Sequence, residues 1–324
     1  MTARFDLAPS SFDGTTPYGP PPGGIRMVAL GDSLTEGLGD PVPGGGWRGW
    51  AALLAAGLRP EPGAVELRNL AVSGALTGDV LRRQLPAARG LRPQVAAVVV
   101  GANDTLRAGY DIRAISANLD AVLAALAAQE ATLLTACLPD PGRMLGLPGP
   151  LARPLARRMR SVNEVVHALT ERHDAVHVHI ADSEWVDDPA MWSVDRLHPS
   201  ERGHRALARC FHQLLRADGT ALGPPPGAEP LGPPPSRGAQ TWWMATKGTG
   251  WVVDRCTDLL PDLLRLAAAE ARHRRRGETA ELDRRAAAET AAALRALNPA
   301  PNLNPAPNLN PHPGLGLDGL RAVG

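Results

Sequence analysis

The chain has 324 residues, a formal net charge of +1 at pH 7 and 44% hydrophobic residues. A chain of this length holds one large domain with additions, and its apolar fraction is sufficient for a folded core. The balanced charge provides no basic stripe of the kind that binds a phosphate backbone, so we expect no nucleic-acid partner.

Predicted strands and helices alternate along the first two thirds of the chain. Short apolar or alternating runs predict strands at residues 26–31, 65–70, 95–100, 131–138 and 176–180. Helical spacing predicts helices at 47–58, 78–85, 112–126, 151–172 and 201–217. We expect Pro86 to end the second helix, Pro154 to lie in the first turn of the fourth, and Ser200 to cap the fifth. This alternation predicts an α/β fold with a parallel five-stranded sheet between two helical layers.

The character of the sequence changes after residue 217. Gly- and Pro-rich stretches predict a stiff linker at 218–240, and Ala-, Leu- and Arg-rich sequence predicts a helical extension at 241–297, broken near Gly277. Residues 298–324 contain a six-residue repeat and are expected to be disordered. Residues 1–24 are interpreted as a flexible lead, which leaves 25–217 as the α/β domain.

Four polar motifs lie near the ends of predicted strands. Gly-Asp-Ser ends the first strand at 31–33, Ser-Gly follows the second at 73–74, and Gly-Ala-Asn-Asp follows the third at 101–104. Asp-Arg-Leu-His occupies 195–198, between the fifth strand and the last helix. Ligands of open parallel sheets gather at the carboxyl ends of the strands, so we expect these motifs to share one site.

Ser33 is the candidate nucleophile of this site. A serine hydroxyl is a poor nucleophile near neutral pH and needs a base within hydrogen-bond reach. His198 is the candidate base, and Asp195 stands one turn before it. Asp195 can accept a hydrogen bond from Nδ1 of His198, which leaves Nε2 for Ser33. We expect Asp32 to bond to backbone in the strand-to-helix turn rather than to take part in the chemistry.

In this order, the four motifs resemble the sequence blocks of the SGNH (GDSL-type) hydrolases, over roughly residues 25–217. The resemblance implies a flavodoxin-like three-layer fold and hydrolysis of carboxylic esters through an acyl-enzyme, with no metal or other cofactor. It also implies that the backbone N–H groups of Ser33 and Gly74 and the side-chain amide of Asn103 form the oxyanion hole. Ala102 stands where the family often has a second glycine.

The substrate is less constrained by the sequence. We expect a small-molecule ester with a short acyl chain or an O-acetyl group, and a lysophospholipid or a thioester is an alternative within the same chemistry. The candidate substrate contacts flank the motifs and are Trp47, Arg107, Tyr110, Trp185 and Trp192. For the three tryptophans, packing in the core or in a lid is an equal alternative. A second class of function is a scaffold that binds a partner protein through residues 241–297.

The remaining histidines are interpreted as structural. His177 and His179 lie two residues apart on a predicted strand, and no carboxylate or cysteine at a persuasive spacing completes a metal site, so we expect a polar strand face. His204 and His212 are expected on the surface of the last helix.

The cysteines indicate the compartment. Cys137, Cys210 and Cys256 are scattered without a CxxC spacing, which is typical of reduced thiols, and the first two are expected in the core. Residues 1–24 lack the apolar segment of a signal peptide, and no stretch approaches the ~20 apolar residues that span a bilayer. We therefore expect a cytoplasmic protein without a transmembrane segment.

Overall fold

The computed structural model describes residues 24–181, 183–231 and 249–297. One parallel sheet of five strands forms its centre, in the spatial order β2-β1-β3-β4-β5. The strands are β1 (Ile25–Gly31), β2 (Val65–Asn69), β3 (Val95–Val99), β4 (Thr132–Cys137) and β5 (Val176–His179). The five predicted strands are thereby confirmed, each to within one or two residues at its ends.

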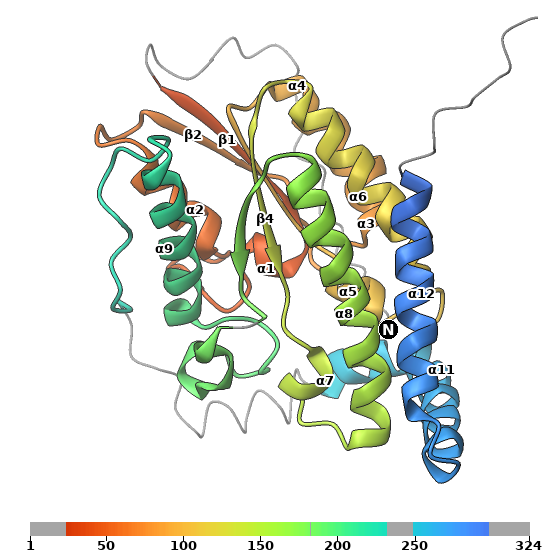
Figure 1. The fold of residues 1–324 in the computed structure, drawn as a ribbon. Coiled ribbons are helices and arrows are strands. Elements are labelled where there is room, and N and C mark those ends of the chain that lie inside the picture. The colour runs from red at the N-terminus through yellow and green to blue at the C-terminus, as the bar shows by residue number, and fades with distance from the viewer. Residues whose placement is uncertain (1–23, 182, 232–248, 298–324) are drawn as a thin grey trace, which may run out of the picture.

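Helices cover both faces of the sheet (Figure 1). One face carries α2 (Gly49–Leu58) and α9 (Glu201–Ala217), and the other carries α4 (Leu85–Leu91), α6 (Ile112–Ala127) and α8 (Gly149–Arg172). Every residue of β3 is buried, as expected of a central strand that is covered on both sides. The predicted three-layer α/β sandwich is confirmed.

Short helices follow the carboxyl ends of the strands or precede α4. They are α1 (Ser33–Glu36), α3 (Thr77–Asp79), the π-helical turn η1 (Val80–Gln84), α5 (Ala102–Thr105), α7 (Pro141–Met144), and the 3₁₀ turns η2 (Glu184–Asp187) and η3 (Pro189–Met191). These turns and loops build one edge of the sheet, where the motifs were expected.

Two helix predictions that depended on proline are wrong. Pro86 does not end a helix, because the chain passes from α3 through η1 into α4 and Pro86 occupies the first turn of α4. Pro154 lies inside α8, because that helix begins at Gly149 and Pro150 occupies its first turn. Proline is compatible with a first turn, where its missing N–H has no helical acceptor.

The prediction that His204 and His212 lie on the surface is also wrong, since both are buried. Nε2 of His212 donates to the carbonyl oxygens of Gly57 and Gly223, at 3.1 Å each. The face of α9 that carries both histidines is covered by α2 and by the chain after α9, an arrangement that helical spacing does not encode.

The first part of the predicted linker lies against the α/β domain. The N–H of Leu222 donates to the carbonyl oxygen of Leu58 at 3.0 Å, and Arg209 donates to that of Pro226 at 2.8 Å. Ala221 is only 2% exposed. Residues 218–231 therefore form an extended strap on α2 and α9.

The helical extension packs on its own domain. Helices α11 (Thr249–Arg275) and α12 (Thr279–Leu297) are separated at Gly277, as predicted, and lie over α6 and α8 (Figure 1). The guanidinium of Arg157 on α8 pairs with Glu270 at 3.1 Å and with Asp283 at 2.9 Å. Glu270 is 1% exposed, so this pairing compensates a buried carboxylate.

Several predictions fall outside the described residues: the lead before residue 24, the second half of the linker, and the tail at 298–324. In the part of the chain that the structure describes, no helix combines the length and the apolar character needed to cross a membrane. Cys137 is buried, as predicted, whereas Cys210 is only partly buried. The side chain of Cys256 lies outside the described residues.

Candidate active site

Ser33 is held at the junction between β1 and α1. The apolar residues of β1 are buried, and the strand ends at Gly31. Asp32 caps α1, and its Oδ1 accepts from the N–H of Leu34 at 3.1 Å. The side-chain amide of the buried Gln84 brackets Gly31, accepting from its N–H and donating to its carbonyl oxygen at 2.8 Å each. The nucleophile candidate therefore stands on a rigid backbone. No sequence signal identified Gln84.

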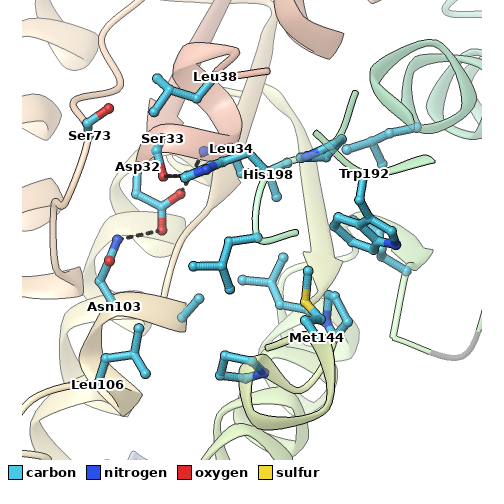
Figure 2. A pocket seen from close by; sticks show the side chains of 18 of the residues that line it. Asp32, Ser33, Leu34, Leu38, Ser73, Asn103, Leu106, Met144, Trp192 and His198 are labelled. Carbon is cyan, nitrogen blue, oxygen red and sulfur yellow. Dashed lines mark hydrogen bonds between the residues drawn. The ribbon is translucent and has the colours of Figure 1, made fainter. Parts of the chain in front are cut away.

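The structure brings the three predicted catalytic side chains together. Nε2 of His198 lies 2.7 Å from Oγ of Ser33 (Figure 2). Nδ1 of His198 lies 2.6 Å from Oδ2 of Asp195. The other carboxylate oxygen of Asp195 accepts from the N–H groups of Leu197 at 2.9 Å and His198 at 3.0 Å, and from Oγ of Ser193 at 2.8 Å. Asp195 therefore fixes both the loop and the imidazole.

The carboxylate of Asp195 is ionised over the pH range in which enzymes usually work. Burial by itself would raise the pKa of Asp195, but the hydrogen bond and charge of His198, with the backbone N–H groups of His198 and Leu197, lower it to about 2. A carboxylate in this state favours the tautomer of His198 that carries its proton on Nδ1, and it would stabilise the imidazolium if His198 accepted a second proton.

A close backbone approach allows residues so distant in sequence to meet. Gly39, after α1, has φ +101°, and a Cβ there would lie 1.9 Å from the carbonyl oxygen of Pro199. Nearby, Nε2 of the buried His204 donates to the carbonyl oxygen of Leu38 at 2.8 Å, while its Nδ1 accepts from the N–H of Trp50 at 3.2 Å. Burial lowers the pKa of His204 to about 4, so this bridge is made by a neutral imidazole.

The expected oxyanion-hole residues Ser33, Gly74 and Asn103 line one pocket. Gly74 has φ +80°, a conformation that glycine adopts without strain. The amide nitrogen of Asn103 donates to Oδ2 of Asp32 at 3.1 Å and to the carbonyl oxygen of Ala75 at 3.3 Å. Substrate must therefore displace one of these acceptors to receive a hydrogen bond from Asn103.

Asp104 ties the Gly74 loop to α5. Its carboxylate accepts from the N–H of Thr77 at 3.1 Å and from Oγ1 of Thr77 at 2.7 Å. Burial raises the pKa of Asp104, and these hydrogen bonds oppose the shift. Asp104 follows Asn103 directly, so its side chain joins the two sides of the expected oxyanion hole. No sequence signal predicted this role.

The model of the GDSL-like lipase/acylhydrolase family matches residues 29–206. The chain belongs to this family. It is a serine-dependent carboxylic ester hydrolase with the α/β fold of that family. A search of curated proteins finds no match.

Solved structures with similar folds are esterases and related hydrolases. An acetylxylan esterase from Geobacillus stearothermophilus is 23% identical, with 60% of this chain and 94% of that chain covered and a TM-score of 0.49. An α/β hydrolase from the metagenome of Lake Arreo, Spain, is 24% identical, with coverages of 61% and 96% and a TM-score of 0.49. A psychrotrophic esterase from Pseudoalteromonas sp. is 19% identical, with coverages of 60% and 97% and a TM-score of 0.47.

The pocket at the candidate active site of the hydrolase is mostly apolar. Beside the candidate catalytic residues, its walls include Leu34, Leu38, Leu106, Leu138, Pro139, Pro141, Met144, Ile180, Trp185, Trp192, Leu197 and Leu207. The rings of Trp185 and Trp192 pack with their centroids 5.4 Å apart. Of the predicted substrate contacts, Trp185 and Trp192 lie in this pocket.

The other predicted substrate contacts lie elsewhere. Trp47 is 44% exposed and is outside the pocket lining. Arg107 and Tyr110 line a separate depression beside Asp104, because the chain turns away from the strand ends after α5. Arg158 of α8 holds them there, stacking over the Tyr110 ring at 4.8 Å and donating to the carbonyl oxygen of Arg107 at 3.1 Å.

Asp32 is more closely coupled to the site of the hydrolase than expected. It forms the predicted backbone hydrogen bond, but it also accepts from Asn103. Burial raises the pKa of Asp32 to about 6, although the hydrogen bonds from Leu34 and Asn103 and the charge of His198 act in the opposite direction. Near neutral pH the folded hydrolase therefore contains a desolvated carboxylate beside the expected oxyanion hole.

We expect Asp32→Asn to change the pH dependence of stability. The pKa of Asp32 in the folded state, about 6, lies above its ordinary value of 3.8, so the folded state binds this proton more tightly than the unfolded state. Stability from that proton is lost as pH rises from about 4 to above 6. Asparagine does not titrate, so between pH 4 and pH 8 the wild type should lose about 2 kcal/mol of unfolding free energy relative to the variant. Urea unfolding at both pH values measures this shift, and parallel pH profiles would contradict it.

Proposed function

We propose that Ser33, His198 and Asp195 carry out the ester hydrolysis. Oγ of Ser33 attacks the carbonyl carbon while Nε2 of His198 takes its proton, and the alcohol then leaves with that proton. His198 next deprotonates a water molecule, which attacks the acyl-enzyme. The bond between the acyl carbon and Oγ of Ser33 then breaks, His198 returns the proton to Oγ, and the carboxylic acid is released. The observation that carries this proposal is the 2.7 Å contact between Nε2 of His198 and Oγ of Ser33 at the pocket wall.

We assign the oxyanion to the backbone N–H groups of Ser33 and Gly74 and the amide of Asn103. All three residues line the pocket beside the nucleophile. The developing negative charge is a stronger acceptor than the carbonyl oxygen of Ala75, which supports an exchange of hydrogen-bond partner by Asn103 as the intermediate forms. Each donor of this kind contributes about 3–4 kcal/mol to transition-state stabilisation.

For the substrate, we propose an ester with a short apolar acyl chain. The pocket has a volume of about 120 Å³, below the ~300–1,000 Å³ of pockets for drug-sized ligands. Its leucine, proline and tryptophan walls offer apolar contact and few partners for hydroxyl groups, which favours an alkyl chain over a sugar ring inside the pocket. An O-acetyl substrate would place only its methyl group there.

A series of p-nitrophenyl esters from acetate to dodecanoate tests this substrate class. We expect kcat/KM to rise by up to about fourfold for each methylene buried, through butyrate and hexanoate, and to fall for dodecanoate. A maximum at acetate would favour O-acetyl substrates instead. A maximum at dodecanoate would favour the lysophospholipase alternative.

A variant pair locates the acyl pocket. Met144 lines the pocket, whereas the neighbouring Leu145 is 38% exposed and lies outside the lining. Met144→Ala should move the preferred acyl chain to greater length, and Leu145→Ala serves as the matched control with an unchanged preference. The same shift in both variants would contradict the proposed pocket.

We also propose a cytoplasmic location, supported by three scattered cysteines that lack a CxxC spacing. We propose no partner protein for residues 241–297, because α11 and α12 pack on α6 and α8 of the same chain.

A further inference from the structure

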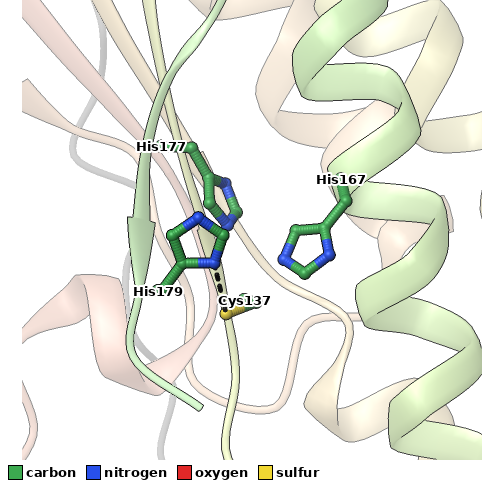
Figure 3. Close-up of side chains that lie close together, drawn as sticks. All are labelled: Cys137, His167, His177 and His179. Atoms are coloured by element: carbon green, nitrogen blue, oxygen red, sulfur yellow. Dashed lines mark hydrogen bonds between the residues drawn. The ribbon is translucent and has the colours of Figure 1, made fainter. Parts of the chain in front are cut away.

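A cluster of three histidines and one cysteine lies between the sheet and α8 (Figure 3). His177 and His179 come from β5, Cys137 ends β4, and His167 comes from α8. Along the sequence, no carboxylate or cysteine stands at a persuasive spacing from the two strand histidines, and this predicted a polar strand face. The fold supplies two partners from elements that are distant in sequence.

The four side chains converge on one small volume. Each offers one ligand atom, and these atoms all lie within 4.8 Å of one another. Sγ of Cys137 lies 4.0 Å from Nδ1 of His179, and the imidazole centroids are 4.6–5.1 Å apart. Bond lengths of about 2.0–2.3 Å to tetrahedral Zn²⁺ place ligand atoms about 3.4 Å apart. Small side-chain rotations therefore suffice to close the site.

His177 is oriented as a metal ligand would be. Its Nδ1 lies 2.9 Å from Oγ1 of Thr135, which in turn lies 2.7 Å from Oγ1 of Thr170. Its Nε2 is buried, and no described residue provides it with a hydrogen-bond partner. In metal sites, the histidine nitrogen that does not bind the metal commonly hydrogen-bonds to a protein group, as Nδ1 of His177 does with Thr135.

We propose that Cys137, His167, His177 and His179 bind one transition-metal cation of borderline softness, with Zn²⁺ as the first candidate. Three imidazole nitrogens and one thiolate suit Zn²⁺, whereas Mg²⁺ and Ca²⁺ prefer oxygen ligands. On binding, the thiol of Cys137 loses its proton to solvent and its sulfur bonds to the metal. The exposed side of His179 leaves an entry path for the ion.

The site would connect β4, β5 and α8 beside the acyl pocket. Leu138 directly follows Cys137, and Ile180 directly follows His179, and both of these apolar residues line the pocket. The metal therefore holds the backbone of one pocket wall and takes no part in the proposed attack by Ser33.

Metal titration of untagged, chelator-treated protein tests the proposal. We expect one equivalent of Zn²⁺ to bind and to raise Tm with increasing free Zn²⁺. Co²⁺ should bind in its place and give a thiolate-to-cobalt charge-transfer band together with the intense visible bands of a tetrahedral site. Wild-type protein that binds neither metal stoichiometrically, or binds Co²⁺ without the charge-transfer band, would overturn the proposal.

Two variants separate a defined site from adventitious binding. His179→Ala changes an exposed residue and should weaken Zn²⁺ binding by at least about tenfold without unfolding the protein. Cys137→Ala should remove the charge-transfer band. The matched controls His173→Ala, whose imidazole pairs with Asp120, and Cys210→Ser should bind as wild type does. Equal loss of binding in the controls, or no loss in His179→Ala, would contradict the assignment.

Discussion

Replacement of Ser33 by alanine is expected to reduce kcat by about 10⁵–10⁶-fold while the protein remains folded. The hydroxyl of Ser33 is the only group that we propose to bond covalently to substrate. The proposed mechanism contains no second hydroxyl or thiol that His198 could activate in its place. The side chain of Ser33 contributes little to the core, so alanine should preserve the fold. Steady-state hydrolysis of a p-nitrophenyl ester, with circular dichroism as the fold check, measures the effect.

Ser73 provides the matched control for this prediction. It lies on the rim of the same pocket, but its Oγ donates a hydrogen bond to the carboxylate of Glu36 at 2.5 Å and does not contact an imidazole. A fluorophosphonate probe should label wild-type protein and Ser73→Ala, and should not label Ser33→Ala. Loss of labelling in Ser73→Ala alone would overturn the assignment of the nucleophile.

Asp195→Asn is expected to reduce kcat by about 10⁴-fold, the second largest effect. An asparagine amide that donates toward Nδ1 would favour the tautomer of His198 with its proton on Nε2, and that tautomer cannot accept the proton of Ser33. The control Asp188→Asn changes an exposed carboxylate that caps η3, and asparagine caps equally well, so its kcat should remain near that of wild type. A loss below tenfold in Asp195→Asn would exclude the proposed role.

The pH dependence of Asp195 adds a second readout. The pKa of Asp195 in the folded state is lowered to about 2. At pH values above the ordinary pKa of 3.8, its ionised carboxylate therefore stabilises the folded state, and this stabilisation is lost only as the pH falls toward 2. A decline in wild-type activity between pH 7 and pH 5 must therefore come from another group. Rate profiles of wild type and Asp195→Asn over this range measure the contribution: the large deficit of the variant should persist at both ends.

Local sequence was sufficient for the parts of the fold that depend on neighbours along the chain. Apolar runs defined the strands because a strand covered on both faces needs little else, as in the fully buried β3. Ser200 was correctly predicted as the cap of α9, and it accepts from the N–H of Gly203 at 3.3 Å. Asp195 and His198 were paired from their spacing because a three-residue separation brings both side chains to one side of a turn.

Only the tertiary structure decided which side chains meet across elements. The burial of His204 and His212 depends on α2 and on the strap at 218–231, and the bracket that Gln84 forms around Gly31 depends on the packing of η1 beside β1. The metal-ligand cluster depends on β4 and β5 being neighbours under α8. Spacing along a chain encodes the direction of side chains within one helix or strand, whereas these contacts depend on strand order and on how the helical layers pack.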